Sequence, residues 1–135
     1  MEIKTNFIIT CREAFLSAGT NNLNLINIFS TINADKFPFA YPHFALVVNL
    51  DVPETGTYAL NTAVAGPDGK ELARTSLSVT VKSANFQVIA NFENMQFAAP
   101  GAYELKVDLD GTPVGSRTIQ VNLVSSPKGK QVNVA

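Results

Sequence analysis

Hydrophobic and polar residues alternate with a period of two along most of the 135-residue chain. Residues 103–109 show this most clearly, with four apolar side chains on one face and three charged ones on the other. Such alternation is typical of a strand that packs one face on a core and leaves the other in water. Asp110-Gly111 follows and favours a tight hairpin turn. We therefore predict a hairpin with a return strand to residue 123, in which Pro113 and Gly115 indicate a bulge or an edge position.

A second hairpin is predicted over residues 58–81. Its turn is Gly66-Pro67-Asp68-Gly69, in which proline sets the backbone angle of the second turn position. A further strand is predicted over residues 86–97. Its alternation shifts near Glu93-Asn94, which predicts a bulge or a bend there.

The N-terminal third also has the pattern of strands, over residues 5–16 and 23–32, with a turn cluster at residues 19–22. A single helical turn over residues 12–16 stays open as an alternative. Residues 45–52 form a nearly continuous apolar run, as expected for a central strand that is covered on both faces.

These segments make about eight strands and no long helix. This pattern predicts an all-β protein, an antiparallel immunoglobulin-like β-sandwich of about eight strands. A closed barrel is the alternative. We expect one domain over residues 1–125, followed by a loosely ordered C-terminal tail over residues 126–135.

Charge and hydropathy restrict the function further. Ten basic and eleven acidic residues leave a net charge of −1, which argues against nucleic acid as a partner. No window approaches the roughly 20 apolar residues of a membrane span, and the N-terminus has no signal-peptide pattern. We expect no membrane insertion and a soluble, cytoplasmic protein.

Several segments together resemble a known family. They are Asn22–Phe29 with Ile32-Asn33-Ala34, Gly66–Lys70, and residues 97–103, which end in Pro-Gly-Ala-Tyr. The resemblance is to a family of short bacterial β-sandwich proteins of unknown function and covers nearly the whole chain. It implies a β-sandwich, and it transfers no catalytic residue.

The chain has few groups for catalysis or metal binding. Cys11 and His43 are the only cysteine and histidine, which excludes an internal disulfide and a zinc site built on either residue type. We expect Cys11 to be buried and inert and His43 to lie at a strand start. Asp51 and Glu54 are too few for a calcium site. We therefore expect no catalytic residues, no metal and no cofactor, with an enzyme that uses His43 or Cys11 kept as an alternative.

The most unusual feature is an aromatic segment interrupted by two prolines. Its aromatic residues are Phe37, Phe39, Tyr41 and Phe44. One interpretation is a crossover loop that plugs the end of the sandwich with its rings. The other is a partly exposed patch that binds a partner.

We therefore expect a non-catalytic binding or assembly module, with Phe37, Phe39, Tyr41 and Phe44 as the candidate binding residues. A protein partner or self-association through an edge strand is expected, since uncharged edge strands favour pairing. A carrier of a small apolar ligand is the alternative.

Overall fold

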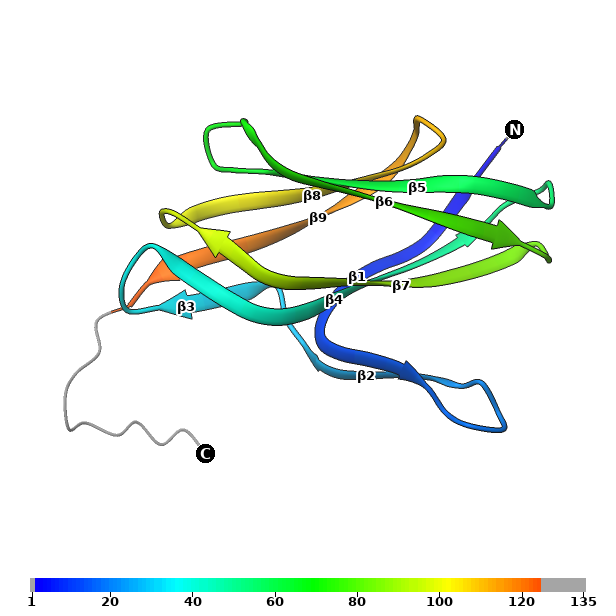
Figure 1. Ribbon diagram of the computed structural model, residues 1–135, viewed down its shortest axis with the longest axis horizontal. Helices are drawn as coiled ribbons and strands as arrows, with labels where there is room; N and C mark the ends of the chain where they lie inside the picture. The colour runs from blue at the N-terminus through cyan, green and yellow to red at the C-terminus, as the bar shows by residue number, and fades with distance from the viewer. Residues whose placement is uncertain (1, 125–135) are drawn as a thin grey trace.

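The computed structural model describes residues 2–124, which form nine β-strands and no helix (Figure 1). The described residues thus include no helix that could cross a membrane. The predicted tail over residues 126–135 lies outside the described part of the chain. The strands are β1 (Lys4–Leu16), β2 (Leu23–Ile28), β3 (Thr31–Ala34), β4 (Phe39–Asp51), β5 (Gly56–Ala65), β6 (Glu71–Val81), β7 (Asn85–Phe97), β8 (Gly101–Leu109) and β9 (Thr112–Leu123).

The strands form two sheets that pack face to face, so the predicted immunoglobulin-like sandwich is confirmed. One sheet has the order β2-β1-β4-β7 and the other the order β3-β9-β8-β5-β6. Neighbouring strands are antiparallel except β3, which lies parallel to β9. We call these the four-stranded and the five-stranded sheet.

Two strands occur where the sequence predicted one over residues 23–32. β2 belongs to the four-stranded sheet and β3 to the five-stranded sheet. The chain crosses between them at Phe29 and Ser30, whose backbone groups bond to Thr10 on one sheet and Gln120 on the other. Residues 12–16 are part of β1, so the alternative of a helical turn is wrong.

Both predicted hairpin turns are present. Asp110 and Gly111 have positive φ angles of 51° and 87°, and the Asp110 carboxylate accepts a hydrogen bond from the Ala59 amide at 2.6 Å. The other turn closes through the Gly69 amide and the Gly66 carbonyl at 2.9 Å. In that turn the Asp68 carboxylate accepts a hydrogen bond from the Lys70 amide at 3.0 Å, so the aspartates of both turns bind backbone amides.

Proline and glycine mark the predicted irregularity in β9. The register shifts where Gly115 pairs with Val107 and Pro113 with Asp108, which confirms a bulge. A Cβ atom at Gly115 would lie 2.9 Å from the Ile8 side chain, so glycine lets β9 approach β1 closely at the side of the sandwich.

The predicted bend in β7 occurs together with a bend in β4. Asn94 has a φ of 51° and lies opposite Pro42, between the pairs Tyr41–Met95 and His43–Glu93. The pairing register does not slip there. In both strands the side chains that face the inner core change here between odd-numbered and even-numbered positions. The two strands therefore bend together.

The inner core fills the space between the sheets. Tyr103 is almost completely buried, as its alternation predicted, and its hydroxyl donates to the Ala99 carbonyl. Phe44, Leu46 and Val48 of β4 point into this core, while Ala45 and Val47 face the opposite side and are equally buried. β4 is therefore covered on both faces, as its apolar run predicted.

Candidate functional site

A hairpin made by the second half of β1 and by β2 covers part of the outer face of the four-stranded sheet. β1 pairs with β4 up to Cys11 and with β2 from Cys11 onward. Figure 1 shows β1 turning sharply, so that the hairpin lies on the side of the sheet away from β5 and β6. We call it the β1–β2 hairpin.

A second, smaller core lies beneath this hairpin. Cys11, Ala45 and Val47 are completely buried at its centre. The half-buried side chains that pack around them are Phe7, Ala14, Leu23, Leu25 and Ile89. We call this group the outer core.

Hydrogen bonds from β1 and β9 to Phe29, which follows β2, hold the base of the β1–β2 hairpin. The Thr10 hydroxyl donates to the Phe29 carbonyl at 2.6 Å. Arg117 of β9 donates to the same carbonyl at 2.8 Å and to the Thr10 hydroxyl at 3.0 Å. Because Arg117 comes from the other sheet, these bonds connect the hairpin to the whole sandwich.

The β1–β2 hairpin exposes several large apolar side chains to solvent. Its large exposed side chains are Phe15 (48% exposed), Leu16 (49%), Ile26 (41%) and Ile28 (58%). The outer edge of β2 has no strand partner among the described residues. Large apolar side chains that gather on a monomer's surface are unusual and commonly mark an interaction site.

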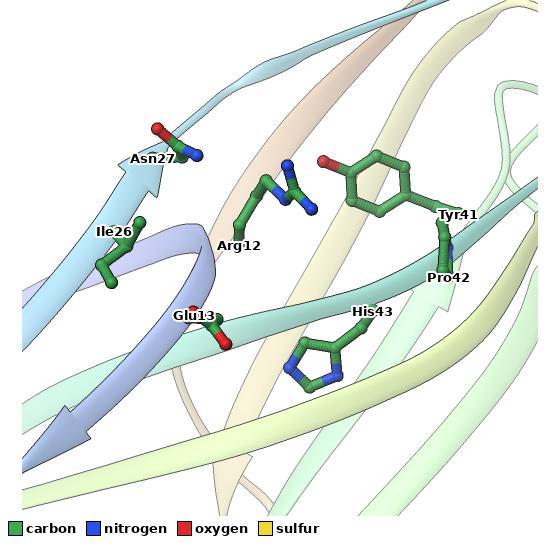
Figure 2. A pocket seen from close by; sticks show the side chains of 7 residues that line it. All are labelled: Arg12, Glu13, Ile26, Asn27, Tyr41, Pro42 and His43. Carbon is green, nitrogen blue, oxygen red and sulfur yellow. The ribbon is translucent and has the colours of Figure 1, made fainter.

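A cavity of about 680 Å³ lies between this hairpin and the start of β4 (Figure 2). Its volume falls in the range of small-molecule sites, roughly 300–1,000 Å³. The lining residues are Arg12 and Glu13 of β1, Ile26 and Asn27 of β2, and Tyr41, Pro42 and His43 of β4.

The polar groups of the cavity differ in whether they already have a partner. His43 Nδ1 lies 2.9 Å from a carboxylate oxygen of Glu93 on β7. Among the described residues, no hydrogen bond or ion pair engages the Arg12 guanidinium, the Glu13 carboxylate or the Tyr41 hydroxyl. Figure 2 shows the Arg12 guanidinium and the Tyr41 hydroxyl pointing toward one another, with Glu13 and His43 on the other side of the cavity.

The structure corrects the description of the aromatic segment as a crossover loop, because residues from Phe39 onward belong to β4. Phe44 is completely buried and stacks on Phe92, with the ring centroids 5.0 Å apart. Phe37, Phe39 and Tyr41 are half-buried and pack against the inner core.

Phe44 therefore has no ring surface to offer a partner. Of the four predicted binding residues, Tyr41 alone lines the cavity. A role in binding for Phe37 and Phe39 stays a prediction.

The two candidate catalytic residues do not contact each other. Cys11 is buried as predicted, and its thiol donates to the Glu13 carbonyl at 3.2 Å. Burial raises the pKa of this thiol, which disfavours the reactive thiolate. His43 lies within β4, paired with Glu93, instead of at the start of the strand.

Acidic residues do not gather into a metal site in the described part of the chain. Asp51 accepts hydrogen bonds from the side chains of Asn85 and Asn6 at 2.9 and 3.1 Å. These bonds, that from Asn85 first, lower the pKa of its carboxyl. Asp51 thus belongs to a network of side-chain amides on the outer face of the sheet.

Sequence analysis did not identify the cavity or the exposed side of the hairpin. Arg12 and Glu13 were assigned only to a strand, and Ile26 and Ile28 to its return. One signal was present in the sequence, since the segment Leu23–Ile28 is apolar or uncharged at every position. A short strand with this composition at the edge of a sheet leaves apolar side chains uncovered.

Solved structures support the fold. An alkylpurine DNA glycosylase from Pseudomonas fluorescens matches with a TM-score of 0.55 at 12% identity, over 90% of this chain and 30% of that protein. An immunoglobulin-like protein from Pseudomonas aeruginosa matches with a TM-score of 0.50 at 13% identity, over 90% of this chain and 97% of that one. A β-glucosidase from Listeria innocua matches with a TM-score of 0.50 at 9% identity, over 93% of this chain and 16% of the enzyme.

The chain thus spans less than a third of the glycosylase and of the β-glucosidase. The two-sheet topology and the likeness to the immunoglobulin-like protein define its class as an immunoglobulin-like sandwich. A search of curated protein sequences gives no match. Residues 6–122 match the family of unknown function DUF6941, and the chain belongs to this family. The resemblance inferred from the sequence is thereby confirmed.

Proposed function

We propose that this protein is a non-catalytic assembly module that binds a second copy of itself through the β1–β2 hairpin. The observation that carries the proposal is that the β1–β2 hairpin exposes four large apolar side chains and that its outer edge has no strand partner within residues 2–124. Burial of apolar surface is the main driving force of most protein association.

The composition of β2 favours pairing with another strand. Soluble proteins usually protect an edge strand with charged residues, proline or a covering segment. β2 has neither charge nor proline in its six residues. Main-chain hydrogen bonds from an added strand would complete its outer edge.

A second copy is the partner that this edge fits best. Antiparallel pairing of β2 with its own copy is two-fold symmetric, so each chain gives and receives the same contacts. β2 has no charge through which to select a different, charged partner. The result would be one continuous sheet across both copies.

Sedimentation velocity at several protein concentrations tests this proposal. We expect the wild type to form a dimer and Ile28→Lys to stay monomeric, because the lysines would put positive charge into the shared edge. Leu72→Lys is the matched control, since Leu72 is also exposed (51%) and lies on β6, the edge of the other sheet.

Leu72→Lys should dimerise like the wild type. A wild type that is monomeric at the highest concentration would overturn the proposal. So would equal effects of the two substitutions. Thermal melting confirms that both variants fold, since exposed substitutions usually change stability by about 0.5 kcal/mol or less.

A further inference from the structure

The cavity beside the β1–β2 hairpin holds groups of opposite charge that have no hydrogen bond or ion pair within residues 2–124. Arg12 supplies a guanidinium and Glu13 a carboxylate, and the Tyr41 hydroxyl points toward Arg12 (Figure 2). Arg117, by contrast, is bonded to Thr10 and Phe29. Arg12, Glu13 and Tyr41 are therefore available to a ligand, whereas His43 is paired with Glu93.

The chemistry of these groups restricts the ligand. A guanidinium has planar, paired donors that match a carboxylate, and a tyrosine hydroxyl can add a further donor. Glu13 can only accept hydrogen bonds when ionised, so it complements an ammonium group. A purely anionic ligand would be repelled by Glu13, and a purely cationic one by Arg12.

The walls between the charged groups suit a short backbone with small side chains. Ile26 and Pro42 are apolar, while Asn27 offers an amide that can donate and accept. The cavity volume of about 680 Å³ exceeds what a single small ion would fill.

We propose that this cavity binds a short zwitterionic peptide. Its carboxylate is held by Arg12 and Tyr41, and its ammonium group by Glu13. Ile26 and Asn27 of β2 line the cavity, but the proposed self-association pairs the backbone of the open edge of β2, so the peptide does not require the dimer.

The test uses trialanine with free ends, trialanine amide and N-acetyl-trialanine, titrated against the protein while backbone amide resonances are followed by NMR. We expect free trialanine to shift resonances of cavity residues. Amidation should weaken binding by about two- to fivefold, in keeping with an ion pair at a solvent-accessible position. N-acetylation should have a similar effect.

Variants that remove one charge from the cavity show which residue binds each end of the peptide. In Arg12→Gln, trialanine and its amide should bind equally, while the effect of N-acetylation remains. In Glu13→Gln, N-acetylation should no longer weaken binding, while amidation should still weaken it. Lys106→Gln, on β8 of the other sheet, removes a positive charge elsewhere and should behave as the wild type.

The proposal is overturned if trialanine shifts no cavity resonance, or if amidation has no effect on the wild type. It is also overturned if the effect of amidation persists in Arg12→Gln or is lost in Lys106→Gln. Repeating the titration with Ile28→Lys separates the two proposals, because peptide binding should be unchanged when the edge of β2 is blocked.

Discussion

The inner and outer cores of this protein bury their centres equally well but differ in how they are enclosed. The inner core lies between two complete sheets, and Tyr103 and Phe44 at its centre are inaccessible. The outer core has a sheet on one side and a two-stranded hairpin on the other. That hairpin is thin, so its far side exposes Phe15 and Ile28.

This difference shows that a hairpin that covers the apolar outer face of β4 can expose apolar side chains of its own. Ala45 and Val47 would be exposed on the outer face of β4 without the hairpin. An isolated two-stranded hairpin is at best marginally stable in water. The β1–β2 hairpin is held because Arg117 and Thr10 secure its base and the outer core secures one face.

The largest effect is expected for Tyr103→Ala in the inner core. Truncation of a large buried aromatic side chain costs about 3–5 kcal/mol of unfolding free energy. Urea denaturation measures it. Tyr103→Phe, which removes only the hydroxyl and its two hydrogen bonds with Ala99, should cost about 0.5–1.5 kcal/mol. A loss below about 1 kcal/mol for the alanine variant would contradict its place in the core.

Val47→Ala in the outer core should have a smaller effect. It removes two buried methyl groups, at about 0.8 kcal/mol for each carbon plus a cavity cost, so we expect about 1–3 kcal/mol. Urea denaturation again measures it, with Val48→Ala in the inner core as the matched control. If Val47→Ala changed stability by less than about 0.5 kcal/mol, the outer core would not be tightly packed.

The smallest effect on stability is expected at Asp51, which lies on the outer face of the four-stranded sheet among side-chain amides. Hydrogen bonds from Asn85 and Asn6 lower its pKa in the folded protein, so this stabilisation is present above the unfolded pKa and is lost as the pH falls through the folded value. The melting temperature of Asp51→Asn should therefore lie below that of the wild type near pH 7, with the gap closing in acid.

Differential scanning calorimetry from pH 2 to pH 7 tests this dependence. Asp35→Asn, at an exposed position outside the strands, is the control for loss of a carboxylate. A gap between Asp51→Asn and the wild type that widens in acid would contradict the assignment.

Much of the fold could be predicted because its signals are local. The Asp110-Gly111 and Gly66–Gly69 turns define their hairpins, and period-two alternation places Tyr103 in the core. The crossing at Phe29 and Ser30 was missed because no glycine or proline marks it. It depends on partners that are distant in sequence, Thr10 and Gln120.

The candidate site was less predictable for the same reason. Tyr41 was identified from local aromatic density and lines the cavity. Arg12 and Glu13 meet Tyr41 only because β1 bends at Cys11 and pairs with both β4 and β2. No short-range pattern reports this bend, so the cavity could not be predicted, whereas the uncharged segment Leu23–Ile28 was a local signal for the exposed side chains of the hairpin.

Hydrogen exchange along Leu23–Ile28, measured by mass spectrometry at two protein concentrations, tests the central claim most directly. We predict that β2 is protected at high concentration, where its outer edge pairs with a second copy, and exchanges faster on dilution. Protection of residues 60–65 of β5, which pair with β6 on one side and β8 on the other, should not depend on concentration. Exchange in β2 that is the same at both concentrations would contradict assembly through the β1–β2 hairpin.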